Sequence, residues 1–337
     1  MKISDLGEFG LIRRIAPLFN RDLPEGLTGI GDDCAVIPWT KSDCLLVTTD
    51  LLIEDTHFIS SRIRPKDLGA KALAANLSDI AAMGGRPLWA FLSLGLPEDT
   101  DVRWLDAFFK GLQACASEHE TRLLGGDTTR SSKGLVIDIA VIGRVARRHV
   151  KFRSTAKASD VIAVTGCLGD SLGGLRLLQE NSSAGRDTRF LIRHHVRPRP
   201  HIEEGRWLSR RPGVRAMMDV SDGLDSDIRR IMDASLCGAD IDLERLPVSP
   251  ALKRTAAARG WDLFSTAACG GEDYCLLFTA DAASWPSLAA AFKKHFGRDV
   301  SPIGKITPAS SGLRYFLNGK PARLSEVGFE HFPAPRG

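Results

Sequence analysis

The chain has 337 residues, of which 43% are hydrophobic, and this length suggests about two globular domains. Its 45 basic and 41 acidic residues leave a net charge of only +4, which argues against nucleic acid as the main partner. No apolar stretch is long enough to span a bilayer, and the N-terminus does not read as a signal peptide. Seven cysteines without a CxxC pair favour reduced thiols, so we expect a cytoplasmic protein without membrane contact.

In the first half of the chain, apolar strands alternate with helices and glycine-containing turns. The pattern predicts strands over residues 43–54, 89–97 and 135–145, and helices over residues 66–85 and 102–119. Alternation of this kind is typical of a mixed α and β domain.

A basic and polar stretch, residues 146–160, interrupts the periodic pattern and indicates the crossing between two domains. We therefore expect an N-terminal domain of residues 1–150 and a C-terminal domain of residues 151–337.

The second half is also mixed. It predicts strands over 160–166, 238–246 and 274–280, with a glycine-rich turn, 166–174, before a short helix. The basic run RHHVRPRP, residues 193–200, favours a surface loop over a phosphate-binding patch because prolines and two neighbouring glutamates accompany it.

Seven aspartates lie at the ends of predicted strands or glycine-containing turns. None of them has a histidine or cysteine nearby in the sequence at the spacing of a metal-binding motif. Oxygen-only clusters suit hard cations such as Mg²⁺. Any one of these acids could be a helix cap or an Asx-turn, but repeated acids would repel unless a cation joined them. The repetition predicts a magnesium-phosphate site formed by Asp32, Asp33, Asp50, Asp79, Asp127, Asp219 and Asp222.

The helix expected from Asp67 to Gly84 has two different faces. Leu73 and Ile80 fall on an apolar side, whereas Asn76 and Asp79 fall on a side of small and polar residues. The polar side could coordinate a cation through water, or it could simply be a solvated surface.

Familiar nucleotide motifs are missing. The segment GCLGDSLGGL lacks the GxGxxG spacing, and the chain has no GxxxxGK[ST] and no HRD or DFG set. Any use of ATP must therefore depend on metal ions and glycine turns.

Seven segments nonetheless match a known family in order along nearly the whole chain: GIGDDCAVIP, TTDLLIEDTHF, KALAANLSDIAAMGGRP, GGDTTR, VTGCLGDSLGGL, DVSDGL and GGEDYCLLF. They resemble the thiamine-monophosphate kinases of the aminoimidazole-ribonucleotide synthetase superfamily. The resemblance implies a two-domain fold, with an N-terminal α/β domain that dimerises through its sheet and a C-terminal α+β domain. It also implies ATP bound near the subunit interface, and ATP-dependent phosphorylation of thiamine monophosphate to thiamine diphosphate with several magnesium ions.

Residue by residue, the resemblance implies three sets of site residues. The metal set is Asp32, Thr48, Thr49, Asp50, Asp79, Asp127, Asp219 and Asp222. The ATP set is Gly126, Asp127, Arg153, Ser221 and Phe109, where Phe109 replaces the tyrosine of many relatives. The substrate set is His57, Glu272 and Phe329. Without the resemblance, His57 could equally be a surface histidine, Glu272 an acid in a turn, and Phe329 an aromatic residue of the core.

The expected chemistry is direct in-line transfer, for which we assign catalytic roles to Asp50, Asp127, Asp222 and Arg153. A phosphate nucleophile, with a second pKa of about 6, is already anionic at pH 7 and needs no strong base. Two alternatives stay open: another ATP-dependent member of the superfamily, or a catalytically silent magnesium-nucleotide sensor.

Overall fold

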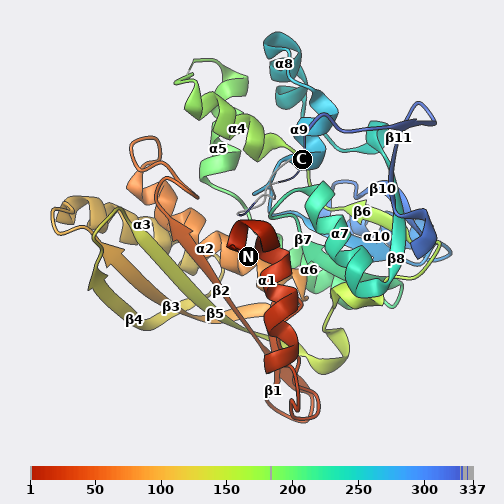
Figure 1. Ribbon diagram of the computed structural model, residues 1–337, viewed down its shortest axis with the longest axis horizontal. Coiled ribbons are helices and arrows are strands. Elements are labelled where there is room, and N and C mark those ends of the chain that lie inside the picture. The colour runs from red at the N-terminus through yellow and green to blue at the C-terminus, as the bar shows by residue number, and fades with distance from the viewer. Residues whose placement is uncertain (1, 183, 327, 329–331, 333–337) are drawn as a thin grey trace.

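The computed structural model describes residues 2–182, 184–326, 328 and 332, and these residues contain two β-sheets (Figure 1). The chain passes from one sheet to the other through residues 147–160, which include two 3₁₀ helices, η1 (Arg147–His149) and η2 (Arg153–Thr155). Both sheets are accompanied by helices, so the mixed α and β structure predicted for both halves of the chain is confirmed. The boundary at residue 150 stays a prediction.

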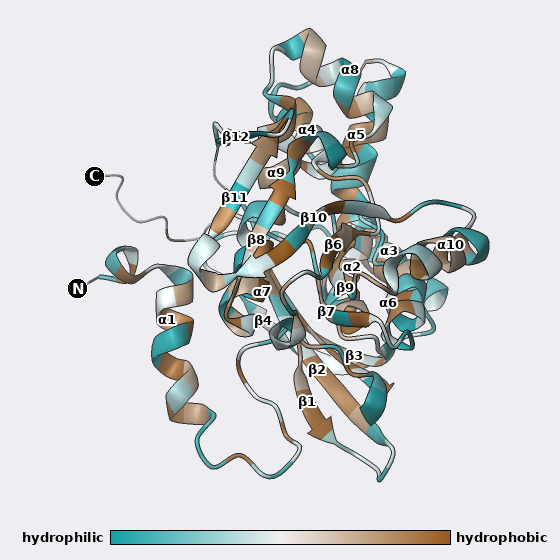
Figure 2. Cartoon of the chain, turned by 90° about the vertical axis from the view of Figure 1, so that its right-hand side faces the viewer, coloured by the Kyte–Doolittle hydropathy of each residue, from teal (hydrophilic) through white to brown (hydrophobic). Residues whose placement is uncertain are grey.

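The first sheet has the strand order β1-β2-β5-β3-β4, in which only β3 and β4 run parallel. Its strands are β1 (Ala35–Pro38), β2 (Asp43–Ile53), β3 (Arg86–Leu96), β4 (Arg122–Arg130) and β5 (Val136–Ala146). Side chains alternate between its faces, as in Ile137, Ile139 and Val141, which are all buried. Figure 2 shows β1 and β2 as largely hydrophobic.

Helices α2 (Pro65–Ala82) and α3 (Val102–Glu118) pack together and cover one face of this sheet (Figure 1). The opposite face keeps large apolar side chains in solvent, including Leu51 at 48%, Phe91 at 38% and Leu124 at 56% exposure. All nine residues of β4 are exposed. The first sheet therefore presents an apolar surface without a covering layer among the described residues.

The second sheet has the order β12-β11-β8-β10-β6-β9-β7, and only β11 and β8 run parallel. Its strands are β6 (Val161–Val164), β7 (Val214–Asp219), β8 (Cys237–Asp242), β9 (Leu276–Ala280), β10 (Ser301–Pro308), β11 (Leu313–Leu317) and β12 (Lys320–Ala322). The remaining helices are α1 (Ile3–Phe19), α4 (Asp170–Gln179), α5 (Arg186–Val196), α6 (Ile202–Ser209), α7 (Leu224–Ser235), α8 (Pro250–Arg259), α9 (Leu263–Cys269), α10 (Trp285–Phe296), η3 (Leu243–Arg245) and η4 (Ala309–Ser311).

Helix α2 is buried on nearly all sides, so the solvated face considered in the sequence analysis is wrong. It packs against the first sheet, and it also packs against β7 of the second sheet and against helix α6. Leu73 and Asn76, from opposite sides of the helix, are exposed by 1% and 0%. The polar side of α2 therefore faces the second sheet unit, and Asp79 can meet residues from both units.

Three further expectations need correction. Asp127 does not follow a glycine turn and Asp50 does not follow a strand: they lie inside β4 and β2, because the segments around them pair with β3 and β5. The predicted glycine turn, 166–174, ends early because α4 begins at Asp170. The carboxylate of Asp273 accepts hydrogen bonds from the backbone N–H groups of Gly169 and Ser171 and so stabilises that helix end.

Within the described part of the chain, every helix is too short or too polar to serve as a membrane span.

Candidate active site

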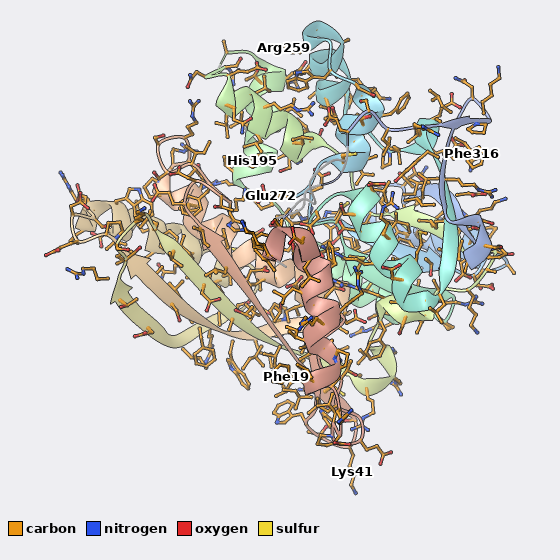
Figure 3. The ribbon with its side chains drawn as sticks, in the orientation of Figure 1. Phe19, Lys41, His195, Arg259, Glu272 and Phe316 are labelled. Atoms are coloured by element: carbon orange, nitrogen blue, oxygen red, sulfur yellow. The ribbon has the colours of Figure 1, made fainter. Side chains whose placement is uncertain are left out.

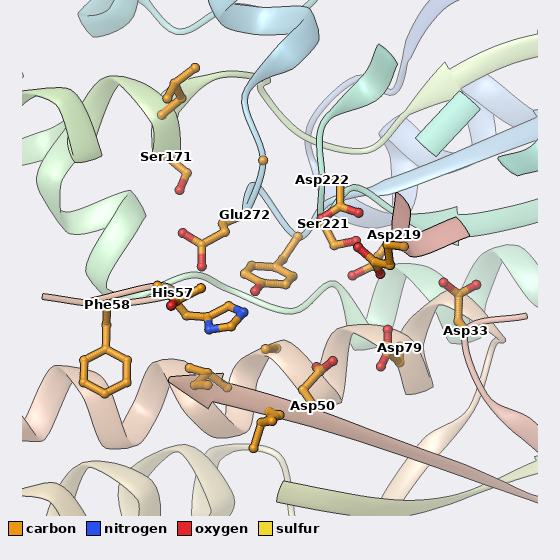
Figure 4. Close-up of a pocket in the computed structure, with 18 of the residues that line it drawn as sticks. Asp33, Asp50, His57, Phe58, Asp79, Ser171, Asp219, Ser221, Asp222 and Glu272 are labelled. Carbon is orange, nitrogen blue, oxygen red and sulfur yellow. The ribbon is translucent and has the colours of Figure 1, made fainter. Parts of the chain in front are cut away.

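A cavity of about 1070 Å³ lies between the two sheet units, and residues of β2, α2, η2 and the loops after β7 and α9 line it (Figure 4). Its volume exceeds the roughly 300–1,000 Å³ of typical small-molecule sites. The cavity contains eleven of the predicted site residues: Asp32, Thr48, Thr49, Asp50, His57, Asp79, Arg153, Asp219, Ser221, Asp222 and Glu272.

Three carboxylates converge in this cavity. Asp33 precedes β1, Asp79 lies on α2 and Asp219 ends β7, and each offers one oxygen within 4.8 Å of the others (Figure 4). Oδ2 of Asp33 is buried and has no hydrogen-bond partner among the described residues. Oxygen ligands at this spacing, with one buried oxygen unpaired, fit a hard divalent cation such as Mg²⁺.

Hydroxyl groups hold two of these carboxylates in place. Thr48 Oγ1 donates to Asp79 at 2.5 Å, and Ser78 Oγ donates to Asp219 at 2.6 Å. Ser78 and Asp79 are neighbours on α2, so a single turn of this helix contacts the end of β7 and the middle of β2. The buried polar side of α2 thus joins the acids of both units.

The electrostatics of the cavity favour a bound cation. Burial, followed by the charge of Asp33, raises the pKa of Asp219 to about 7. Burial, followed by the charge of Asp222, raises the pKa of Asp50 to about 6, and burial also raises the pKa of Asp79 well above its usual range. Carboxylates that repel one another in a buried place resist ionisation until positive charge joins them.

Asp32 and Asp33 have different surroundings. The resemblance carried a metal role to Asp32, whereas the converging cluster contains Asp33. Asp32 accepts the backbone N–H of Arg153 at 3.1 Å, and Arg153 Nη2 donates to Asp33 at 2.6 Å. Burial, followed by Asp33, raises the pKa of Asp32 to about 7. The metal role of Asp32 stays a prediction, and Asp33, one of the seven acids noted in the sequence, joins it as a candidate ligand.

The turn after β7 forms a second part of the site. Oδ2 of the buried Asp227 accepts the backbone N–H groups of Ser221, Asp222 and Gly223 at 3.1–3.2 Å. Arg230 on α7 donates to both Asp227 and Asp222. Neither Asp227 nor Arg230 was predicted from the sequence, although the acids Asp225 and Asp227 in the first turn of α7 indicate that this helix start carries charge.

Gly126, Asp127 and Phe109 are not part of the large cavity. They line a separate pocket of about 470 Å³ between β4 and α3. Gly126 has φ of +153°, and a Cβ there would lie 1.7 Å from the Leu92 carbonyl oxygen, so only glycine fits. The structure of one chain therefore separates these three residues from the other predicted ATP and metal residues.

The predicted substrate residues His57 and Glu272 lie together at the end of the cavity away from Asp33 (Figure 4). His57 Nδ1 accepts the backbone N–H of Ile53 at 3.0 Å, which fixes its ring at the end of β2. Phe329 lies outside the described residues.

Comparison with known families matches the two sheet units separately. The family described as "AIR synthase related protein, N-terminal domain" matches residues 31–145, and "AIR synthase related protein, C-terminal domain" matches residues 157–315. The thiamine-monophosphate kinase of Escherichia coli (strain K12) is 40% identical over 334 residues, covering 98% of this chain and 99% of the relative. The chain belongs to the thiamine-monophosphate kinase family. The resemblance stated from the sequence motifs is thereby confirmed.

Relatives and solved structures support the same membership. The thiamine-monophosphate kinase of Aquifex aeolicus is 34% identical and covers 98% of this chain and 100% of the relative. A structure described as "AaThiL complexed with AMPPCP and TMP" is 33% identical, has a TM-score of 0.85, and covers 98% of this chain and 99% of that one. The thiamine-monophosphate kinase from Stenotrophomonas maltophilia K279a is 36% identical, with a TM-score of 0.75 and coverage of 94% and 98%.

Proposed function

We propose that this protein phosphorylates thiamine monophosphate with ATP, producing thiamine diphosphate and ADP. The observation that carries the proposal is the large cavity in which carboxylates from both sheet units converge beside Arg153. A relative of 33% identity is described in complex with AMPPCP and TMP, and its fold matches this chain over 98% of its length.

The charges explain why such a cavity suits phosphoryl transfer. Two phosphate charges 4 Å apart repel by about 4 kcal/mol at an effective dielectric constant of 20. When bound, Mg²⁺ supplies positive charge between donor and acceptor phosphates. The residues that would hold it are Asp33, Asp79 and Asp219, with Thr48, Asp50 and Asp222 beside them in the same cavity.

The protein's own groups supply position and charge for an in-line transfer. The backbone of Ser221 and Asp222 is fixed by Asp227, and Arg153 is fixed by Asp33, so both are preorganised before a ligand arrives. The acceptor phosphate is an anion at pH 7 and needs no general base. We assign Asp50, Asp222 and Arg153 to this step, and Asp127 with Gly126 and Phe109 to ATP binding.

A direct assay tests the function. Purified protein is incubated with ATP, MgCl₂ and thiamine monophosphate, and thiamine diphosphate is measured by chromatography. We expect turnover that requires all three components. Binding of ATP without product would instead favour the magnesium-nucleotide sensor, and product formation only with a different phosphate acceptor would favour another activity of the superfamily.

We also propose a cytoplasmic homodimer joined through the first sheets. Leu51 and Phe91 are 48% and 38% exposed on one sheet face, and β4 is exposed along its length. A second copy of the same apolar surface would cover them with two-fold symmetry. All seven cysteines are free thiols, which supports a reducing compartment.

A further inference from the structure

A fully buried lysine stands beside the predicted substrate end of the cavity. Lys71 of α2 has a side chain that is 1% exposed, and its Nζ lies 2.9 Å from Oε2 of Glu272. Glu272 belongs to the loop between α9 and β9, so this ion pair joins the two sheet units. A buried ion pair is a poor way to gain stability, because an apolar pair of similar size is often equally stable or more so. Its presence at a ligand cavity therefore points to a role in binding.

A buried histidine approaches the same oxygen of Glu272. His195 Nδ1 lies 3.3 Å from Glu272 Oε2 and 3.1 Å from Ser171 Oγ, and Figure 3 labels His195 and Glu272 close to each other. Burial, followed by the charge of Lys71, lowers the pKa of His195 to about 3, so the ring is neutral at pH 7. Since a carboxylate only accepts, we assign the proton of the neutral ring to Nδ1. The surface loop expected for residues 193–200 is wrong here, because His195 is buried within α5.

The backbone of Glu272 is also held in an unusual conformation. Glu272 has φ of +62° and Tyr274 has φ of +48°, a region that residues other than glycine rarely adopt. The Glu272 N–H donates to the Ser221 carbonyl at 2.7 Å, and the Tyr274 N–H donates to the Val220 carbonyl at 2.9 Å. Such strain persists only where surrounding contacts fix the chain, and it gathers at functional sites. The loop is thus tied to the turn that carries Ser221 and Asp222.

Glu272 remains available to a ligand. Its side chain is 28% exposed, and the contacts from Lys71 and His195 both fall on Oε2, which leaves further acceptor capacity on the carboxylate. Burial would raise the pKa of Glu272, but the charge of Lys71 and its hydrogen bond outweigh burial and hold the pKa below its usual range. A ligand entering the cavity meets this carboxylate and not the buried ammonium group.

We propose that Lys71 and His195 are positioning residues that hold Glu272 as an ionised acceptor for the N–H-bearing heteroaromatic part of a phosphate substrate that also carries a cationic ring. The proposal rests on the proposed function, since thiamine monophosphate is such a compound. Phe58, Leu172 and Leu175 line the same cavity and supply apolar surface for a ring. The substrate class is therefore a monophosphate with a cationic heteroaromatic ring, and we expect phosphate esters without such a ring to bind less well.

The decisive variant is Lys71→Met, which removes the ammonium group and keeps a side chain of similar length. Steady-state kinetics with thiamine monophosphate and with ATP as the varied substrate give separate KM values. We expect KM for thiamine monophosphate to rise about tenfold or more, and KM for ATP to change less than about twofold. The double variant Lys71→Met/Glu272→Gln should be no worse than Glu272→Gln alone, because both act through one carboxylate.

Matched variants separate positioning from general destabilisation. Arg298→Met breaks another ion pair that has one buried partner, Glu204 at 2.6 Å, away from the cavity, and should lower the melting temperature without raising KM for thiamine monophosphate. His195→Asn keeps an N–H donor near the position of Nδ1, whereas His195→Leu removes it, so the Asn variant should bind the substrate more tightly. If Lys71→Met does not fold, the comparison of His195→Asn with His195→Leu tests the proposal instead.

The outcomes distinguish a failure of the proposed function from a failure of the positioning role of Lys71 and His195. Wild-type protein that fails to phosphorylate thiamine monophosphate contradicts the proposed function. Wild-type protein that is active, with an unchanged or lower KM for thiamine monophosphate in Lys71→Met, overturns the positioning role and leaves the function intact. Calorimetric titration of thiamine monophosphate into each variant without ATP should show the same order of affinities as the KM values.

Discussion

Replacing one acid of the converging cluster should stabilise the metal-free protein at alkaline pH. Asp219 is 1% exposed, and its pKa rises from 3.8 to about 7. This raised pKa corresponds to about 4 kcal/mol of unfavourable free energy when the carboxylate is ionised in the folded state. Asp219→Asn removes this penalty and keeps a side-chain oxygen for the hydrogen bond from Ser78.

The sign of the pH dependence follows from the raised pKa. Below about pH 4, Asp219 is protonated in both the folded and unfolded states, and Asn should offer no advantage. As the pH rises from about 4 to 7, the unfolded state loses this proton first, so the wild-type protein loses stability relative to the variant. The advantage of Asp219→Asn should therefore grow across this range and stay constant above it.

Only the difference between variant and wild type isolates this effect. Burial lowers the pKa of His195 to about 3 and that of His201 to about 4. Because these pKa values are depressed, stability from the neutral rings is present above pH 6.5 and is lost as the pH falls. The two histidines thus oppose the aspartate in the wild-type profile, but they contribute equally to both proteins.

Thermal unfolding in EDTA at pH 4, 6 and 8, and in MgCl₂ at pH 8, measures the prediction. Asp219→Asn should melt several degrees above wild type in EDTA at pH 8 and should lose most of the stabilisation by magnesium. Asp299→Asn, at an exposed ion pair with Lys293, is the control and should change neither result. A metal-free Asp219→Asn protein less stable than wild type at pH 8 would refute the argument that repulsion and burial strain this cluster.

Two other predictions test the site and the assembly. Asp50→Asn and Asp222→Asn should each reduce turnover by at least about a hundredfold without lowering the melting temperature in EDTA, because each removes a ligand charge facing the cavity rather than core packing; near-normal activity at low magnesium would contradict the metal roles. Phe91→Asp should convert the proposed homodimer to a monomer in light scattering, since it buries a charge in the proposed interface; a dimer of unchanged stability would exclude this face.

The strands and helices of the first sheet unit were largely predictable from sequence, because β2, β5, α2 and α3 carry strong periodic patterns. The edge strand β4 was missed. Its residues Gly125 and Gly126 suggest a turn, and only pairing with β3 makes the segment a strand. Local pattern carries no information about such a partner.

The acids of the site were recognisable by residue type, but their grouping was not. Sequence spacing places Asp33, Asp79 and Asp219 far apart, and they meet only because α2 is buried between the two sheet units. Nothing in the sequence indicated that Lys71 and His195 belong to the site. A lysine in a helix and a histidine in a basic run are normally solvated, and only the tertiary structure buries both beside Glu272.

Asp127 lies too far from the other predicted metal ligands to share an ion with them in one chain. In the order β2-β5-β3-β4, strand β4 is three positions from β2, which separates Asp127 from Asp50 by about 14 Å in one chain. Ligands of one Mg²⁺ lie about 2.1 Å from the ion, so these two acids cannot share an ion within a single chain. Since β4 is exposed and borders the proposed interface, we expect Asp127 of one copy to complete the ATP site of the other.

Mixing two inactive variants tests this arrangement. Asp127→Asn and Asp222→Asn homodimers are combined under conditions that allow subunit exchange. If each site uses Asp222 from one copy and Asp127 from its partner, every mixed dimer has one intact site. Random exchange makes half of the dimers mixed, so activity should recover to about a quarter of the wild-type value. If both acids serve a site within one chain, no mixed dimer contains an intact site, and the absence of recovery with exchange demonstrated independently would contradict a shared site.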